Sequence, residues 1–346
     1  MTVSFNNLRR ILLASLALMG CVFLVACGSS DSDSGSDGGS GSGSLEGKKV
    51  VLVACSEENQ WCRAYNNKIV DDLESKGVEV SYLQDPYDPV LQAQNLNQAV
   101  SQDPDAILVL ATDAKAVVPG LRKAEAAGIP VINLVGPTVP ESEEFYAGSI
   151  EVNHEELGKN AGELLMAGLE EEGVKGGNVI AITGATVQPE VAVRMAGFEE
   201  VLDEHPDFDL VEVQDGAWDQ VKTANIAQQL FAKYTGDDKI VGAYGMADQQ
   251  AAGIIQAAQQ AGMPVGVQDK GLVVVASNCF KIGMENIASG KQYGTSTQAA
   301  GATADFTLPL VEEFLKTGEM PERSLTKEEQ ITQENLGEWK KDCSVA

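Results

Sequence analysis

Polar side chains follow, or end, most of the predicted strands of this chain. Amides such as Asn59 and Asn278 can donate and accept hydrogen bonds at the same time, which a ligand with several hydroxyl groups requires. Ligands of open α/β sheets bind beyond the carboxyl ends of the strands. The pattern therefore predicts capture of a small molecule. The candidate contacts are Asn59, Thr112, Asp113, Asp248, Asn278 and Gln298.

Asp113 and Asp248 have a second interpretation, because both lie at the start of a predicted helix. A carboxylate there can accept hydrogen bonds from the first backbone N–H groups and so cap the helix. The sequence leaves both alternatives open, ligand contact or helix cap.

No motif in the chain indicates catalysis. The sequence contains no Gly-x-Gly-x-x-Gly after a strand, no phosphate loop ending in Gly-Lys-Ser/Thr and no Gly-x-Ser-x-Gly elbow. The two histidines, His154 and His205, have no partners at a metal-ligand spacing, and we expect both to be structural. The sequence thus predicts a protein that is not an enzyme and has neither cofactor nor metal.

The charge balance limits the class of partner. The chain has 24 basic and 51 acidic residues, a formal net charge of −27. Such a surface repels nucleic acids and anionic lipid headgroups, so neither is expected as a ligand. About 300 residues follow the N-terminal segments, more than one core usually serves, so two domains are expected.

Short apolar runs alternate with helical stretches from residue 48 onward, and the pattern restarts after the run 145–150. Continuous apolar strands separated by single helices indicate parallel sheets covered on both faces, here two doubly wound α/β lobes. Strands are expected at 50–54, 78–83, 106–110, 130–134, 178–182, 209–214, 240–244, 272–276 and 292–298. Helices are expected at 61–76, 89–101, 114–127, 153–172, 190–204, 220–233, 247–262, 279–290 and 302–316. The tail 320–346 is polar and expected to be irregular, with Trp339 as its apolar anchor.

The N-terminus has the pattern of a bacterial lipoprotein signal peptide. Arg9 and Arg10 precede an apolar run that is too short for an ordinary membrane span and ends at Cys27. We expect cleavage after residue 26 and lipidation of Cys27, with a plain secretory peptide or a retained anchor helix as alternatives. The Gly/Ser/Asp-rich stretch within 27–47 has almost no apolar side chain to bury and is expected to be a flexible linker.

Four cysteines remain beyond Cys27. Outside the cytoplasm an even number favours disulfides, and four cysteines allow three pairings. Cys55 and Cys62 flank a single loop, so their pairing is the simplest, and Cys279 would then join Cys343. The alternative is that these thiols stay free.

Five short motifs, in this order, resemble the type I periplasmic binding proteins of the ribose and galactose cluster. The resemblance covers nearly all of the chain beyond residue 48, and the order and spacing of the motifs carry it more than any single motif does. The motifs are Asp-Ala-Ile-Leu-Val-Leu at 105–110, Ala-Gly-Ile-Pro-Val-Ile at 127–132, Leu-Gly-Lys-Asn-Ala-Gly at 157–162, Arg-Met-Ala-Gly-Phe at 194–198 and Ile-Ala-Ser-Gly-Lys at 287–291.

The resemblance implies two lobes joined by three chain crossings, with a ligand cleft between the lobes. We expect the crossings near 149–151, near Gln298 and near 321–324. The N-terminal lobe would then comprise 48–149 plus 299–321, and the C-terminal lobe 150–298 plus 322–346. Cys279 and Cys343 both fall in the second lobe under this division, which supports their pairing.

The resemblance also implies that aromatic rings sandwich a sugar. Trp61 and Trp218 occupy matching positions after strands of opposite lobes, and we expect both to stack on the ligand, with ordinary packing at a helix start as the alternative. Several charged contacts of the ribose type are absent: Val135-Gly136 replaces an Asp-Arg pair, Ala192 replaces an arginine, and Asn278 replaces an aspartate. Gly136 and Glu190 complete the candidate set; Glu190 lies near enough to replace a missing charged contact, but its residue type favours a solvated surface position.

The sequence therefore predicts an extracytoplasmic, lipid-anchored and monomeric substrate-binding protein. By resemblance it would close on a small neutral ligand, a sugar or polyol, and deliver it to an ABC transporter permease. The departures from the ribose pattern keep a second ligand class open: a signalling furanone, a nucleoside or an aromatic compound. A ligand sensor for a membrane receptor is a further alternative.

Overall fold

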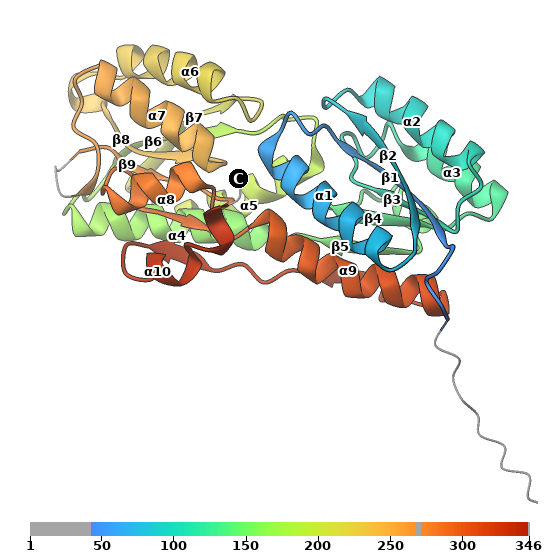
Figure 1. Ribbon diagram of the computed structural model, residues 1–346. Coiled ribbons are helices and arrows are strands. Elements are labelled where there is room, and N and C mark those ends of the chain that lie inside the picture. The colour runs from blue at the N-terminus through green and yellow to red at the C-terminus, as the bar shows by residue number, and fades with distance from the viewer. Residues whose placement is uncertain (1–42, 268–270, 345–346) are drawn as a thin grey trace, which may run out of the picture. The chain divides into compact units, whose positions relative to one another are not determined.

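Two six-stranded sheets form the centres of two lobes, which Figure 1 shows. The computed structural model describes residues 43–267 and 271–344. The predicted signal peptide at 1–26, Cys27 and nearly all of the linker lie outside the described residues. Within those residues, no helix is long and apolar enough to cross a bilayer.

The first sheet has the strand order β11-β5-β4-β3-β1-β2, and every pairing in it is parallel. Its strands are β1 (Lys49–Cys55), β2 (Glu79–Asp85), β3 (Ala106–Val109), β4 (Val131–Val135), β5 (Gly148–Glu151) and β11 (Arg323–Leu325). The second sheet has the order β12-β10-β9-β8-β6-β7, and only β12 runs antiparallel to its neighbour. Its strands are β6 (Gly177–Thr183), β7 (Phe208–Asp215), β8 (Ile240–Gly245), β9 (Val273–Val275), β10 (Gly294–Ser296) and β12 (Gln330–Thr332).

Helices cover both faces of each sheet. In the first lobe these are α1 (Gln60–Ser75), α2 (Pro89–Ser101), α3 (Val118–Ala127) and α9 (Ala300–Thr317). In the second they are α4 (His154–Glu171), α5 (Pro189–Asp203), α6 (Gln220–Lys233), α7 (Asp248–Gln260), α8 (Lys281–Ala288) and the short α10 (Leu336–Trp339). α1 packs on α9, α2 on α3, α4 on α5, and α6 on α7. This arrangement confirms the predicted fold class of two parallel-sheet lobes.

The sequence of β1 explains why both faces are covered. Leu52 and Ala54 point into the core beneath α1 and α9, whereas Val51 and Val53 point into the core beneath α2 and α3. A strand with apolar side chains on both sides cannot leave either side in water. Helices therefore cover both faces of the sheet, and the carboxyl ends of the strands are left uncovered, where a binding site can form.

Three short links carry the chain between the two sheets, at 152–153, 297–299 and 326–329. The third lies beyond the expected crossing near 321–324, because β11 pairs with β5 and so belongs to the first sheet. Assigning 322–346 as a whole to the second lobe is corrected accordingly. The tail is also not irregular, because backbone pairing with β5 and β10 organises its polar residues into β11 and β12.

Both predicted disulfides are present, Cys55–Cys62 and Cys279–Cys343. Cys279 and Cys343 lie in one apolar cluster with Met284, Ile287 and Ile331, and Trp339 packs against that cluster. The second disulfide and Trp339 therefore fasten the end of the chain to the second lobe.

Candidate ligand-binding site

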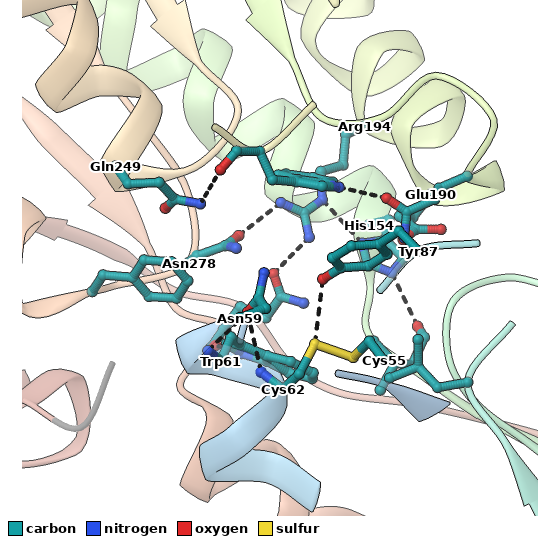
Figure 2. A pocket seen from close by; sticks show the side chains of 16 residues that line it. Cys55, Asn59, Trp61, Cys62, Tyr87, His154, Glu190, Arg194, Gln249 and Asn278 are labelled. Atoms are coloured by element: carbon teal, nitrogen blue, oxygen red, sulfur yellow. Dashed lines mark hydrogen bonds between the residues drawn. A yellow bond between two sulfur atoms is a disulfide. The ribbon is translucent and has the colours of Figure 1, made fainter. Parts of the chain in front are cut away.

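A pocket lies where the carboxyl ends of the strands of one sheet face those of the other, and Figure 2 shows its lining. Residues from both lobes contribute, together with Gln298 in the second link. Six of the predicted site residues line it: Asn59, Trp61, Glu190, Trp218, Asn278 and Gln298. Polar or aromatic residues that the sequence reasoning did not assign to the site also line it: Tyr87, His154, Gln188, Arg194, Gln249 and Phe280.

Four predicted contacts, Thr112, Asp113, Gly136 and Asp248, lie outside this lining. The Thr112 hydroxyl is buried and donates to Asp85 at 3.0 Å. Asp113 accepts from the N–H groups of Lys115 and Ala116, so it caps a turn that precedes α3 and delays the start of that helix to Val118. The capping alternative therefore describes Asp113.

Asp248 and Gly136 have other roles. Asp248 is fully buried, and its two oxygens accept from the Phe280 N–H at 2.7 Å and the Gln292 amide at 2.8 Å. It therefore fixes the start of α8, and it is not the side-chain cap of α7. Gly136 adjoins the pocket wall, since a Cβ at this position would lie 3.3 Å from Oε2 of Glu190.

Arg194 on α5 is the centre of the polar network, and only 2% of it is exposed. Its Nε donates to Nδ1 of His154 at 3.0 Å, and one terminal nitrogen donates to the Met246 carbonyl at 3.2 Å and to Oδ1 of Asn278 at 2.7 Å. The other donates to Oε1 of Gln298. Burial lowers the pKa of Arg194, while Tyr244 and Glu190 oppose the shift. The pocket therefore contains a charged arginine, Arg194. The sequence did not indicate this, because Ala192 stands where proteins of the ribose type have an arginine.

Hydrogen bonds within the protein orient the three predicted amide side chains. Asn59 uses Oδ1 to accept from the N–H groups of Trp61 and Cys62, which starts α1. Asn278 and Gln298 use their side-chain oxygens for Arg194. Among the described residues, no hydrogen bond engages the three NH₂ groups. The amides therefore present donors to the pocket, whereas the sequence predicted both donors and acceptors.

Two acceptors complement these donors. Oε2 of Glu190 and Oε1 of Gln249 are buried and have no hydrogen-bond partner among the described residues. A buried acceptor without a partner costs about 1–3 kcal/mol, which a ligand hydroxyl could recover by donating to it. The pocket thus offers donors and acceptors to a ligand that carries several hydroxyl groups.

Burial raises the pKa of Glu190 to about 7, while its own backbone N–H and Arg194 oppose the shift. A carboxyl whose pKa is higher in the folded than in the unfolded chain stabilises the fold below about pH 4.5, and this contribution is lost as the pH rises through about 7. We expect Glu190→Gln to raise the melting temperature at pH 8 more than at pH 5. The gain at pH 8 is at most about 3 kcal/mol. Thermal unfolding at the two pH values checks this.

Glu212 is the matched control for that experiment. Hydrogen bonds from Lys233, Gln214 and Tyr234 lower the pKa of Glu212 to about 2, so its contribution is present above about pH 4.5 and is lost in acid. Glu212→Gln should therefore lower the melting temperature at pH 8. A Glu190→Gln variant that is equally destabilised at both pH values would contradict the assignment.

The two tryptophans line the pocket from opposite lobes, but both indole N–H groups are used within the protein. Trp61 donates to the Gln298 carbonyl at 2.8 Å, and its ring stacks on Tyr65 with centroids 4.9 Å apart. Trp218 donates to Gln188, and the Arg194 guanidinium carbon lies 5.6 Å from its ring centroid. The rings are therefore held in place and can act as fixed walls.

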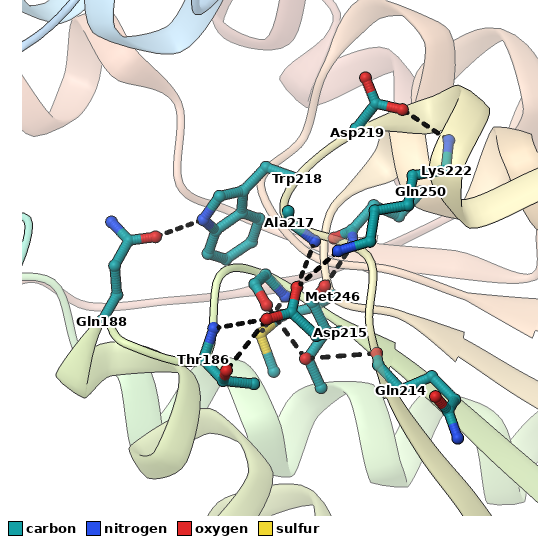
Figure 3. Close-up of polar contacts among 12 residues, drawn as sticks. Thr186, Gln188, Gln214, Asp215, Ala217, Trp218, Asp219, Lys222, Met246 and Gln250 are labelled. Carbon is teal, nitrogen blue, oxygen red and sulfur yellow. Dashed lines mark hydrogen bonds and ion pairs between the residues drawn. The ribbon is translucent and has the colours of Figure 1, made fainter. Parts of the chain in front are cut away.

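The loop that carries Trp218 is fixed by Asp215 at the end of β7, as Figure 3 shows. The Asp215 carboxylate accepts from the Ala217 N–H at 2.7 Å and from the Thr186 hydroxyl at 2.9 Å. Gln249 donates to the Trp218 carbonyl. These contacts join the loops after β6 and β7 to the first turn of α7 and so form one wall of the pocket.

Left-handed backbone conformations concentrate in the lining. Tyr87, Val135, Trp218 and Asn278 have φ angles of 59°, 67°, 59° and 88°. Asn tolerates this region, but a β-branched residue such as Val135 adopts it only where the surrounding structure enforces it. Strained backbone of this kind clusters at functional sites, so it independently marks this end of the strands.

Comparisons with known proteins agree with the geometry. A family model described as a periplasmic binding protein domain matches residues 50–319. The galactofuranose-binding protein of Escherichia coli is 25% identical over 273 residues, which cover 78% of this chain and 83% of that protein. The D-ribose/D-allose-binding protein of Pseudomonas aeruginosa is 24% identical over 321 residues, 89% of this chain and 93% of that protein.

Solved structures share the fold. A galactofuranose-binding protein superposes with a TM-score of 0.77 at 20% identity, covering 84% of this chain and 96% of that one. A solute-binding protein of an ABC transporter from Bacillus halodurans, with bound myo-inositol, superposes with a TM-score of 0.74 at 19% identity, covering 86% and 99%.

Proposed function

The chain belongs to the periplasmic binding protein family, and on that premise we propose that it captures a small neutral sugar or polyol between its two lobes. One observation carries the proposal: unpartnered donors and acceptors from both lobes line one pocket. The NH₂ groups of Asn59, Asn278 and Gln298 would donate to ligand oxygens, and Glu190 and Gln249 would accept from ligand hydroxyls.

A neutral ligand fits the charges of the pocket. Arg194 and Glu190 have opposite charges when both are ionised, so they interact favourably across the site and need no counter-charge from the ligand. The walls formed by Trp61 and Trp218 suit the C–H faces of a sugar ring. Binding would close the lobes, because contacts from both lobes form only when they meet.

Delivery to an ABC transporter permease and anchoring through a lipidated Cys27 are further parts of this proposal. The names of relatives support the first: they include a D-apiose import binding protein of Paraburkholderia graminis, and the Bacillus halodurans structure is the solute-binding protein of an ABC transporter. The signal-peptide pattern that ends at Cys27 supports the second. We propose a monomeric, extracytoplasmic binding protein that is not an enzyme.

A thermal-shift screen of the purified protein tests the function. The panel is D-ribose, D-allose, D-galactose, L-arabinose, D-apiose, D-fructose, myo-inositol and xylitol, with nucleosides and small aromatic compounds for comparison. A ligand at about a hundred times its dissociation constant adds about 2.7 kcal/mol of stability, a shift of a few degrees. We expect a sugar or polyol to give this shift.

Substitutions of the tryptophans locate the binding. Trp61→Ala and Trp218→Ala should abolish the shift, because each removes a wall of the pocket. Trp339→Phe is the control, since Trp339 packs in the cluster around Cys279 and Cys343 instead. A shift given only by a nucleoside or an aromatic compound would overturn the sugar assignment and leave the fold unaffected.

A further inference from the structure

His154, the first residue of α4, contacts both lobes through its two ring nitrogens. Its Nε2 lies 3.0 Å from the carbonyl oxygen of Val135, at the end of β4 in the first sheet. Its Nδ1 lies 3.0 Å from Nε of Arg194, on α5 of the second lobe. His154 is 3% exposed, and Figure 2 shows it beside Arg194 and Glu190.

The partners fix which nitrogen carries the proton. Arg194 Nε–H can only donate, so Nδ1 of His154 must be the unprotonated acceptor. The Val135 carbonyl can only accept, so Nε2 carries the hydrogen and donates. The imidazole is therefore neutral and in a single tautomer. Burial and the charge of Arg194 lower the pKa of His154 well below its usual value, which agrees with a neutral ring.

Arg194 depends on this contact for its orientation. Its nitrogens donate to His154, the Met246 carbonyl, Asn278 and Gln298, none of which is a carboxylate. The Nε bond is the one nearest the side-chain stem, so it sets the plane in which the two terminal nitrogens meet Asn278 and Gln298. Without the Nε bond to His154, the planar guanidinium could rotate and lose its hydrogen bonds to both Asn278 and Gln298.

We propose that His154 is a positioning residue, which holds the guanidinium of Arg194 in its ligand-binding orientation and couples it to the first-lobe backbone at Val135. The proposal rests on the proposed function, because there Arg194 belongs to the ligand site. The carbonyl oxygen of Val135 also accepts from the Val152 N–H at 2.9 Å, and Val135 itself has a left-handed backbone conformation with φ of 67°. The His154 ring thus links Val135, at the end of β4, to Arg194, so a shift of β4 would move Arg194 as well.

Two conservative substitutions separate the two bonds of the ring. In His154→Asn, the amide oxygen can occupy the place of Nδ1 and accept from Arg194. In His154→Gln, the amide nitrogen can occupy the place of Nε2 and donate to Val135, but no acceptor remains for Arg194. We expect His154→Asn to bind within about threefold of the original protein and His154→Gln to bind about tenfold or more weakly, since a hydrogen bond to a charged group is lost.

The affinity is measured with the panel sugars, by tryptophan fluorescence on the full chain. His205→Asn is the control, because His205 is exposed and its substitution should leave the affinity unchanged. The reverse order, with His154→Gln binding well and His154→Asn poorly, would overturn the proposal. It would show that only the structural bond to Val135 matters.

A second readout needs no ligand. The chain has two histidines, so the His205→Asn variant assigns the nitrogen resonances of both in an ¹⁵N-labelled sample. We expect His154 to show protonated Nε2 and unprotonated Nδ1, and the Nε–H signal of Arg194 to be protected from exchange. That protection should persist in His154→Asn and disappear in His154→Gln.

The two readouts distinguish the possible failures. A charged ring, the opposite tautomer or an unprotected Arg194 signal in the original protein would overturn the positioning role, whatever the ligand. If no panel sugar binds while the NMR result is as expected, the proposed sugar ligand fails and the His154–Arg194 coupling stands.

Discussion

Replacing Arg194 with alanine should abolish ligand binding, with an affinity loss of at least about a hundredfold. The substitution removes the donor that orients Asn278 and Gln298 and leaves Nδ1 of His154 without its partner. Without Arg194, the amides of Asn278 and Gln298 can turn their NH₂ groups away from the ligand, and losing two ligand hydrogen bonds of about 1.4 kcal/mol each corresponds to about a hundredfold. Isothermal titration calorimetry with the best panel compound measures the loss.

Arg194→Lys should weaken ligand binding nearly as much as Arg194→Ala does. The acceptors around Arg194 come from four separate segments, namely the start of α4, the loops after β8 and β9, and the second link. A lysine ammonium is a point charge on a flexible stem and cannot meet all four with a planar fork. Arg122→Lys is the matched control, since Arg122 stacks on Phe145 in the first lobe, outside the pocket. A lysine variant that binds within threefold would contradict the role of the fork.

Removing the Cys279–Cys343 disulfide should produce the largest loss of stability. The bond closes a separation of 64 residues, whereas Cys55–Cys62 closes 7. Loop-closure entropy assigns about 4 kcal/mol to the first and about 2 kcal/mol to the second. We expect serine replacement of Cys279 and Cys343 to lower the melting temperature by on the order of 10 °C. Serine replacement of Cys55 and Cys62 should lower it by about half as much.

The variant without Cys55–Cys62 should lose more ligand affinity than the variant without Cys279–Cys343, although it loses less stability. Cys55 and Cys62 line the pocket, and Cys62 Sγ contacts the Tyr87 hydroxyl at 3.3 Å. Cys279 and Cys343 lie in the cluster around Ile331 and outside the lining. Calorimetry below the melting temperature should therefore show weaker binding only for the variant without Cys55–Cys62. Equal losses of affinity in the two variants would refute this division.

Local sequence signals were sufficient for most of the architecture. The apolar runs of the central strands gave both sheets, because a strand buried on both faces has no polar alternation to confuse its assignment. Asn59 and Trp61, which the sequence predicts as contacts, reach the pocket lining because they follow β1 directly. The tail was misjudged because β11 and β12 have no strand-like composition, and only pairing with β5 and β10 makes them strands.

Arg194 and His154 show the limit of searching directly after the strands. Arg194 lies in the second turn of α5, and it reaches the pocket because α5 begins at Pro189 beside the pocket. The motif at 194–198 drew attention to this arginine as a family feature but not as a site residue. The sequence predicts a structural role for His154. Its contacts with Val135 and Arg194 depend on bringing two lobes together, which spacing along the chain cannot reveal.

In the proposed closure, the three links between the sheets would determine how far each part of the pocket travels. Three short connections side by side permit the lobes to turn about an axis through them but resist sliding. Gln298 lies in one link and His154 adjoins another, whereas Asn59 and Trp218 stand on loops after strands of opposite lobes. On rotation, a point moves in proportion to its lever arm, so the residues at the axis stay nearly still. Under the proposed closure, Gln298 would therefore already stand in its final position when a ligand enters, and the walls formed by Trp61 and Trp218 would reach theirs afterwards.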